Sequence, residues 1–204
     1  MVKKFREIEN YLDNYYKTHK RHRNPSRFAK FCLKYLKPKS SIMDICCGDG
    51  RDSYFFYKKG FKVYGIDNAE IVERLENKKN LRFIRCNLES INKKFSCNVD
   101  NVYCRFILHC IDESIQKTLF NWIKYIKGIL CIETRSVNDK LYDKGKKVGE
   151  DAFITNHYRR FLRKEDLEKI LKKNGFKIIF SKEDINFAPY KNENPSIIRI
   201  IAKC

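Results

Sequence analysis

Two glycines and an acid follow short apolar runs in the first third of the chain, at a spacing that could serve a nucleoside. The apolar run 41–45 leads into Gly48 and Gly50, and a second run, 62–66, ends in Asp67. Glycines between a strand and a helix leave the backbone bare for a ligand to approach. An acid at the tip of the next strand can bind both hydroxyls of a ribose. The spacing therefore predicts a pocket for a cofactor that contains adenosine.

The charges around the glycines indicate which adenosine cofactor the pocket would take. A dinucleotide fingerprint has a third glycine where this chain has Ser53, and Asp49 and Asp52 would repel a pyrophosphate. The same carboxylates favour a cationic ligand such as S-adenosylmethionine, which carries an ammonium and a sulfonium and no phosphate. Transfer of its methyl group is an in-line displacement, so the protein must align donor and acceptor and must deprotonate a hydroxyl acceptor.

The segment 44–50 resembles motif I of the class I S-adenosylmethionine-dependent methyltransferases, with Cys46 at the position of the usual first glycine. The segment 60–67 resembles the second motif, and the resemblance extends in weaker form across about residues 25–202. It implies an acid after the third strand that faces the adenine amine, where this chain has Asn87 and Leu88. The cofactor-binding residues that we expect are Asp44, Cys46, Gly48, Asp49, Gly50, Arg51, Asp52, Asp67, Asn68, Asn87, Leu88 and Arg105.

Two arginines and two tyrosines belong to the expected pocket. Arg51 follows the glycines and could pair with the cofactor carboxylate. Arg105 lies in an apolar run, which is costly unless the guanidinium is paired or faces a cavity. We therefore expect Arg105 to point into the site, towards cofactor or acceptor. Tyr15 and Tyr16, on an expected N-terminal helix, could cover the cofactor.

A cluster of polar and basic side chains ends a long polar segment and could serve the acceptor. His157 is the leading candidate for general base, because the reference pKa of histidine lies near neutrality. His109 and Arg160 are further catalytic candidates. Glu133 and Arg135 close a predicted strand and face the expected site. The substrate-binding candidates are Glu133, Arg135, Tyr158 and Arg159.

Three further segments, 25–29, 105–109 and 157–161, resemble small stand-alone methyltransferases of bacteria and large DNA viruses that act on sugars or glycan ends. The resemblance implies O-methylation of a hydroxyl on a glycan or nucleotide sugar, which would be the partner of this chain. The stretch 47–52 is also similar to thiol and tellurite-resistance methyltransferases. The basic N-terminal region suggests an RNA or cap methyltransferase as an alternative. A further alternative is a non-catalytic nucleic-acid-binding module on a degenerate methyltransferase fold.

Alternating strand and helix patterns predict an α/β fold in a single domain, 1–204. We expect a doubly wound, seven-stranded, mostly parallel sheet with an antiparallel C-terminal hairpin, because the last two strands lack a helix between them. An N-terminal helical cap, 1–38, would precede a Rossmann-like core, 39–204, with an irregular substrate loop at 135–160. The expected strands are about 41–46, 62–66, 81–86, 101–107, 128–134, 176–181 and 196–202. The expected helices are about 2–18, one capped by Asn24 or Ser26, 51–59, 69–77, one from Asp112 to about 126, and 164–174, which Gly175 would end.

Composition bounds the partners and the compartment. The formal net charge is +19, and twelve lysines and arginines against three acids fall in residues 1–40. This excess indicates weak polyanion binding or only the lysine-rich composition of AT-rich genomes. No run reaches membrane-spanning length and none resembles a signal peptide, so we expect a cytoplasmic protein, in the host cytoplasm if viral. The nine cysteines form no C-x-x-C pair, so we expect no metal site, and their odd number fits a reducing compartment.

Overall fold

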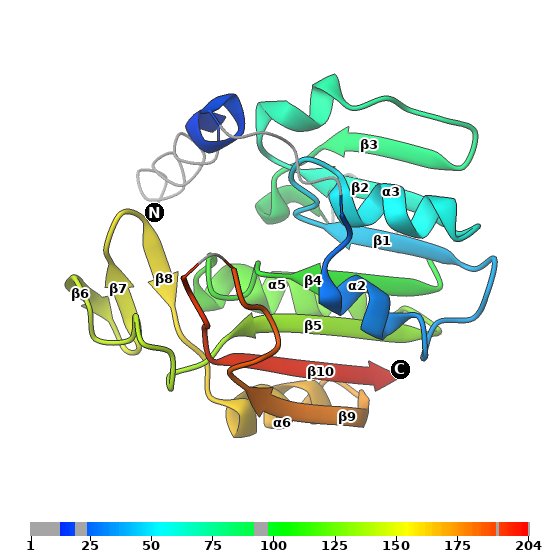
Figure 1. Ribbon diagram of the computed structural model, residues 1–204. Helices are drawn as coiled ribbons and strands as arrows, with labels where there is room; N and C mark the ends of the chain where they lie inside the picture. The colour runs from blue at the N-terminus through cyan, green and yellow to red at the C-terminus, as the bar shows by residue number, and fades with distance from the viewer. Residues whose placement is uncertain (1–12, 19–23, 92–97, 191, 204) are drawn as a thin grey trace.

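The computed structural model describes residues 13–18, 24–91, 98–190 and 192–203, and it contains a central sheet with helices on both faces (Figure 1). The strands of this sheet are β1 (Ser41–Ile45), β2 (Lys62–Asp67), β3 (Leu81–Arg85), β4 (Asn101–Arg105), β5 (Ile129–Arg135), β9 (Lys177–Asp184) and β10 (Ile197–Lys203). Their order across the sheet is β3-β2-β1-β4-β5-β10-β9. Strands β1 to β5 are parallel, and β10 pairs antiparallel with β5 and β9. This architecture confirms the predicted fold class.

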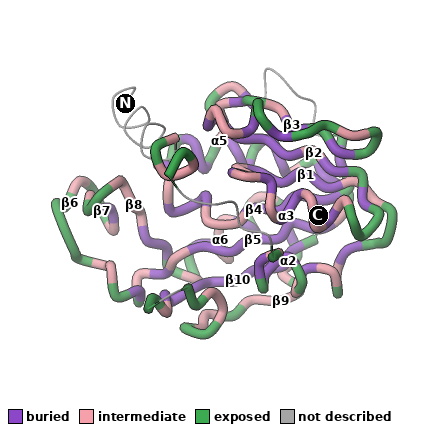
Figure 2. Tube along the Cα trace, turned by 45° about the horizontal axis from the view of Figure 1, so that its top comes forward, coloured by how far each residue is buried: buried purple, intermediate pink, exposed green. Residues whose placement is uncertain are grey.

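Helices on the two faces of the sheet bury two separate apolar clusters. The helices are α2 (Arg27–Cys32), α3 (Arg51–Lys58), α5 (Glu113–Ile123) and α6 (Lys164–Lys173). Helices α2 and α3 cover one face, where Phe28 and Phe56 are fully buried. Helices α5 and α6 cover the other face, where Leu119 and Leu171 are fully buried. Figure 2 shows the buried residues concentrated along the strands between these two layers.

Three predicted helix boundaries are confirmed. The Oγ of Ser26 accepts a hydrogen bond from the backbone N of Ala29 at 2.9 Å and so caps α2. Asp112 caps α5 in the same way, through the backbone N of Ile115. Gly175 follows α6 with φ of +88°, a left-handed conformation that ends a helix.

The predicted helix at 69–77 is wrong, because the segment forms only a short 3₁₀ helix, η1 (Glu70–Arg74). Two adjacent β-branched residues within it disfavour a longer helix. The side chain of Asn77 then accepts a hydrogen bond from the backbone N of Phe83 at 2.7 Å, which holds the chain in a turn before β3. The connection from β2 to β3 therefore lacks a full covering helix.

The segment 135–160 is more regular than predicted. It contains a second antiparallel sheet, whose strands are β6 (Lys146–Gly149), β7 (Ala152–Ile154) and β8 (Tyr158–Arg160). The ring of Tyr142 packs edge-on against the rings of Phe153 and Phe161. Strands of three or four residues are too short for an apolar alternation to reveal them. The expected irregular loop is thus a small sheet, which Figure 1 shows beyond the end of β5.

The predicted helix at 2–18 lies partly outside the described residues. Residues 13–18 are helical, and the side chain of Asp13 accepts a hydrogen bond from the backbone N of Glu70 at 2.9 Å. This contact joins the segment to the connection that follows β2. In the portions of the chain that the structure describes, no helix combines the length and the apolar character that a bilayer span requires.

Candidate active site

The loop from β1 to α3 turns sharply because three of its residues adopt left-handed backbone conformations. The φ angles of Cys46, Gly48 and Gly50 are +58°, +55° and +76°. A Cβ on Gly48 would lie 2.1 Å from the Oη of Tyr16, and one on Gly50 would lie 2.9 Å from the ring of Phe83. Both glycines are therefore required by backbone conformation and by packing. Cys46 adopts the same left-handed conformation although it has a side chain. That conformation explains why glycine is usual at this position.

A cavity of about 320 Å³ opens beside this loop, at the carboxyl ends of β1, β2 and β4. Its volume falls in the range of small-ligand sites. Gly50 does not line the cavity and serves the turn instead, whereas Tyr15 and Tyr16 do line it. The other eleven predicted cofactor-binding residues all line it, namely Asp44, Cys46, Gly48, Asp49, Arg51, Asp52, Asp67, Asn68, Asn87, Leu88 and Arg105.

Asp67 is held rigidly at the tip of β2. One carboxylate oxygen accepts a hydrogen bond from the backbone N of Gly48 at 2.8 Å, and the other accepts one from Ala69 at 2.9 Å. Burial raises the pKa of Asp67, although these backbone hydrogen bonds favour the ionised form. The carboxylate therefore joins the glycine loop to the end of β2, where a ribose would lie.

Two further buried acids on the same side of the cavity differ in protonation. Burial and the nearby charge of Asp52 raise the pKa of Asp44 to about 8, against the hydrogen bond that Ser53 donates to it. Burial disfavours the ionised form of Asp52 too, but Arg51, Arg105 and hydrogen bonds from Ser26 outweigh it and hold its pKa low. Asp52 is thus an anion at neutral pH, whereas Asp44 is largely protonated.

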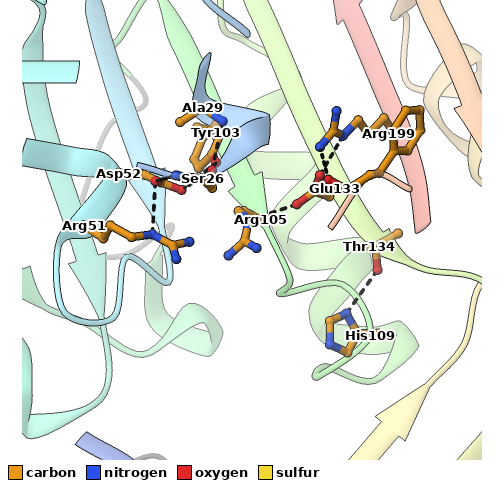
Figure 3. A network of polar contacts seen from close by, with 11 residues as sticks. Ser26, Ala29, Arg51, Asp52, Tyr103, Arg105, His109, Glu133, Thr134 and Arg199 are labelled. Carbon is orange, nitrogen blue, oxygen red and sulfur yellow. Dashed lines mark hydrogen bonds and ion pairs between the residues drawn. The ribbon is translucent and has the colours of Figure 1, made fainter. Parts of the chain in front are cut away.

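The side chain of Asp52 anchors the segment before α2. It accepts hydrogen bonds from the backbone N of Ser26 at 2.8 Å, from the Ser26 Oγ at 2.7 Å and from the Tyr103 Oη at 2.8 Å. The Nε of Arg51 lies 3.3 Å from the same carboxylate. Figure 3 shows these groups converging on Asp52. The donors come from three separate parts of the chain and fix α3 against α2 and β4.

Arg105 lines the cavity as predicted, and it is paired as its burial requires. Its Nε donates to Glu133 at 2.9 Å, and the other oxygen of Glu133 accepts from the Nε of Arg199 at 2.6 Å (Figure 3). Burial disfavours the charged guanidinium of Arg105, but Glu133, Tyr103 and Asp52 outweigh it and raise its pKa. Glu133, predicted to contact the substrate, does not line the cavity, and its carboxylate forms these two ion pairs.

His109 and Arg160, two of the catalytic candidates, make structural contacts and do not line the cavity. The Nδ1 of His109 lies 3.3 Å from the Oγ1 of Thr134, and burial followed by the charge of Arg135 lowers its pKa well below the usual value. Arg160 donates to the carbonyl of Ile111 at 3.3 Å and also to the side chain of Gln116. These contacts tie β8 to the start of α5.

The remaining acceptor-side candidates also lie outside the cavity lining. Burial, Arg159 and Arg135 together lower the pKa of His157 to about 4, so its imidazole is neutral at physiological pH. Arg135 forms ion pairs with Asp139 at 2.9 Å and Glu193 at 3.2 Å. Burial raises the pKa of the cavity-lining Cys110 thiol to about 11. The charges of Arg159 and Arg135 oppose this rise. Arg160 on β8 donates to the carbonyl of Ile111, which lines the cavity, so β8 lies beside the cavity.

Comparison with known proteins gives the family. A family model described as a methyltransferase domain matches residues 17–180, which include the glycine loop and the second sheet. The chain belongs to this methyltransferase family. The predicted enzyme class and cofactor are confirmed at this level: the chain is an S-adenosylmethionine-dependent methyltransferase.

Solved structures of methyltransferases share the fold. An S-adenosylmethionine-dependent methyltransferase from Methanosarcina mazei has a TM-score of 0.72 at 19% identity, with coverage of 85% of this chain and 96% of that one. The 1,6-didemethyltoxoflavin-N1-methyltransferase of Burkholderia thailandensis, solved with bound 1,6-didemethyltoxoflavin and S-adenosylhomocysteine, has a TM-score of 0.65 at 16% identity. In that comparison the coverage is 86% of this chain and 75% of the other.

A viral protein matches part of the sequence. It comes from Acanthamoeba polyphaga mimivirus, is named as a candidate RNA methyltransferase, and is 29% identical over 100 residues, or 47% of this chain. The aligned part is 24% of the viral protein, so the chain spans about a quarter of the length of this curated relative.

The cavity of this methyltransferase fits its cofactor by the chemistry of its lining. The glycine loop leaves backbone exposed, Asp67 is fixed where a ribose would bind, and carboxylates favour the cationic methionine end. The site residues that the sequence did not suggest are Tyr103, which lines the cavity, and Ser26 and Arg199, which do not line it but bind Asp52 and Glu133. Arg199 lies within the apolar run 197–202, the same signal that drew attention to Arg105.

Proposed function

We propose that this methyltransferase transfers the methyl group of S-adenosylmethionine to a hydroxyl of a glycan or nucleotide sugar. The observation that carries the proposal is the cavity itself, which has the acid-lined glycine loop on one side and Arg105 on the other. The polar and basic cluster of His157, Tyr158 and Arg159 stands beside it. Such a mixture of hydrogen-bonding groups suits an acceptor rich in hydroxyls.

Each part of the donor would have its own partner in the cavity lining. Asp67 would accept from the ribose hydroxyls, and Asn87 and Leu88 would contact the adenine. Arg51 would pair with the carboxylate of the methionine part. The bound donor supplies an electrophilic methyl group on a positively charged sulfur. The protein holds that methyl in line with the acceptor oxygen, so that positioning accounts for much of the rate.

His157 remains our candidate for the group that removes the acceptor proton. Its pKa of about 4 keeps the imidazole unprotonated at neutral pH, although it makes His157 a weaker base than an ordinary histidine. Because His157 does not line the cavity, the acceptor would extend from the cavity towards β8 to reach it. His109 is buried and contacts Thr134, so we favour His157 over it for this role.

A screen with tritiated S-adenosylmethionine tests the acceptor class. Purified protein would be offered glycans, nucleotide sugars, small thiols and RNA in parallel reactions. We expect label to appear in a sugar and to be released neither by base treatment that cleaves esters nor by nuclease. Transfer to thiols or to RNA, with none to sugars, would contradict the proposal.

RNA methylation is a second candidate, favoured by the similarity to the mimivirus protein. The net charge of +19, concentrated in residues 1–40, would then serve to bind the polyanion weakly. Gel-shift titration with labelled RNA at several salt concentrations would test this role. Binding that depends steeply on salt and accompanies methyl transfer to RNA would favour the RNA candidate over the sugar.

A further inference from the structure

We propose that Arg105 selects an acceptor sugar that carries an oxyanion, a carboxylate or a phosphate, next to the hydroxyl that is methylated. This inference rests on the proposed sugar acceptor and adds the feature of the acceptor that the cavity would recognise. It is carried by the placement of Arg105, by the charge balance around it and by the separate position of Arg51.

Arg105 is the last residue of β4 and presents its guanidinium to the cavity. The group stacks on the ring of Phe106, with 4.2 Å from its central carbon to the ring centroid, and Phe106 adopts a left-handed φ of +59° to bring the ring there. The Nε is occupied by Glu133, and Figure 3 shows the two terminal nitrogens pointing away from that carboxylate. Two coplanar N–H donors match the geometry of a carboxylate or phosphate.

Arg105 shares its ion-pair partner with a second arginine. Glu133 is 1% exposed and is shared between Arg105 and Arg199, so this trio carries one excess positive charge. Arg51 and Asp52 form the adjacent pair and cancel each other. A guanidinium that is mostly withdrawn from water and shares its counter-ion with a second arginine favours the arrival of an anion.

Glu133 and Arg199 fix Arg105 in this orientation. The guanidinium of Arg199 is held over the ring of Phe187 at 4.2 Å and donates to the backbone carbonyl of that residue at 2.8 Å. Because Arg199 is held in place on β10, it keeps one carboxylate oxygen of Glu133, and only the other oxygen pairs with the Nε of Arg105. Glu133 is thus a positioning residue that leaves the outer edge of Arg105 available for a ligand.

The carboxylate of the donor is the competing anion, and position in the fold separates the two. Arg51 begins α3, directly after the glycine loop that faces the methionine part of the donor. Arg105 lies at the end of β4, next to β5, which ends in the substrate-binding candidate Arg135. We therefore assign the donor carboxylate to Arg51 and the acceptor oxyanion to Arg105.

A matched panel of sugars tests the selection without any mutation. Wild-type protein would be given tritiated S-adenosylmethionine with glucose, glucuronate, glucose phosphate, UDP-glucose and UDP-glucuronate. We expect kcat/KM for the anionic sugars to exceed that for glucose by about tenfold or more, since a charged bidentate contact is lost with the neutral sugar. Preference for glucuronate would identify a carboxylate, and preference for the phosphorylated sugars a phosphate. Equal rates for glucose and the anionic sugars would overturn the inference.

If no sugar in the panel is methylated, that result counts against the proposed function and not against the anion site. A binding measurement tests the anion site separately. Protein saturated with S-adenosylhomocysteine would be titrated with inorganic phosphate in a calorimeter. We expect phosphate to bind, Arg105→Gln to weaken it about tenfold or more, and Arg105→Lys to restore part of the loss. The matched control is Arg74→Gln, because Arg74 is exposed and lies outside the cavity.

The affinity for S-adenosylhomocysteine, measured on the same variants, shows whether Arg105 binds the donor carboxylate or the acceptor oxyanion. We expect Arg105→Gln to leave that affinity within about threefold of wild type, which also shows that the variant is folded. Absence of phosphate binding by the wild type, or equal binding by Arg105→Gln, would overturn the inference. A loss of S-adenosylhomocysteine affinity in Arg105→Gln at unchanged thermal stability would overturn it as well, because Arg105 would then bind the donor carboxylate.

Discussion

The Oη of Tyr16 lies so close to Gly48 that a Cβ on the glycine would approach it to 2.1 Å. The helical segment 13–18 therefore packs directly on the glycine loop, and Tyr16 lines the same cavity. Burial and the charges of Asp67 and Asp49 raise the pKa of Tyr16 well above its usual value, so the phenol remains neutral. The loop and its cover form one unit that depends on the missing side chain at position 48.

Replacement of Gly48 by alanine should disrupt this unit. The left-handed backbone would cost about 1–2 kcal/mol of stability, and the contact with Tyr16 would open the cavity. We expect affinity for S-adenosylhomocysteine to fall about tenfold or more in a calorimetric titration. Gly60→Ala is a matched control, because Gly60 has φ of +87° with no atom within 4 Å of an added Cβ. If both variants bind like wild type, the proposed role of Gly48 is wrong.

Ser26 caps α2 and also donates a hydrogen bond to Asp52, so its replacement should remove both interactions. Ser26→Ala removes the acceptor for the backbone N of Ala29 and a donor to a buried carboxylate. We expect the free energy of unfolding to fall by about 2 kcal/mol in urea denaturation. Ser114→Ala is the comparison, since Ser114 is exposed and should change stability by about 0.5 kcal/mol or less. Equal effects would show that the Ser26 contacts contribute little.

Asp44 should make stability decrease as the pH rises towards alkaline values. Its pKa is raised from 3.8 to about 8, so the folded state binds a proton that the unfolded state releases. The stabilisation is complete below the unfolded pKa and is lost as the pH rises through about 8. Denaturation of wild type and Asp44→Asn across this window should show a steeper decline in the wild type. Parallel curves would mean that Asp44 is ionised throughout.

His157 should be required for turnover and dispensable for donor binding. We expect His157→Ala to lower kcat about 100-fold or more with unchanged affinity for S-adenosylhomocysteine, because general base catalysis contributes at least this much. The low pKa predicts that kcat/KM of the wild type is constant through neutral pH and declines only as the pH approaches about 4. Unchanged turnover in the variant would eliminate His157 as the base.

The donor side of the site was predictable because its signals are local in sequence. Gly48, Gly50 and Asp67 mark the ends of β1 and β2, and parallel strands bring their carboxyl ends to one edge. The helix caps at Ser26 and Asp112 were equally local. The segment 69–77 forms η1 and a turn instead of an α-helix, and the turn is held by a hydrogen bond from the backbone of β3 to the side chain of Asn77. The spacing of apolar residues in the sequence does not reveal such a contact.

The contacts of the acceptor-side residues could not be predicted from the sequence because they are long-range. Glu133 faces two arginines from different strands, and one of them, Arg199, is 66 residues away in the chain. Arg160 was expected at the chemistry, but its side chain reaches the start of α5 instead. Three charges inside apolar strands, at positions 105, 133 and 199, could have suggested a buried ion-pair network.

We expect the cavity beside Gly48 to bind a sulfonium donor and not a dinucleotide. Calorimetric titration of the full chain with S-adenosylmethionine, and separately with NAD, tests it most directly. We predict one bound S-adenosylmethionine for each chain and no heat with NAD. Binding of NAD, or no binding of S-adenosylmethionine by folded protein, would contradict the account.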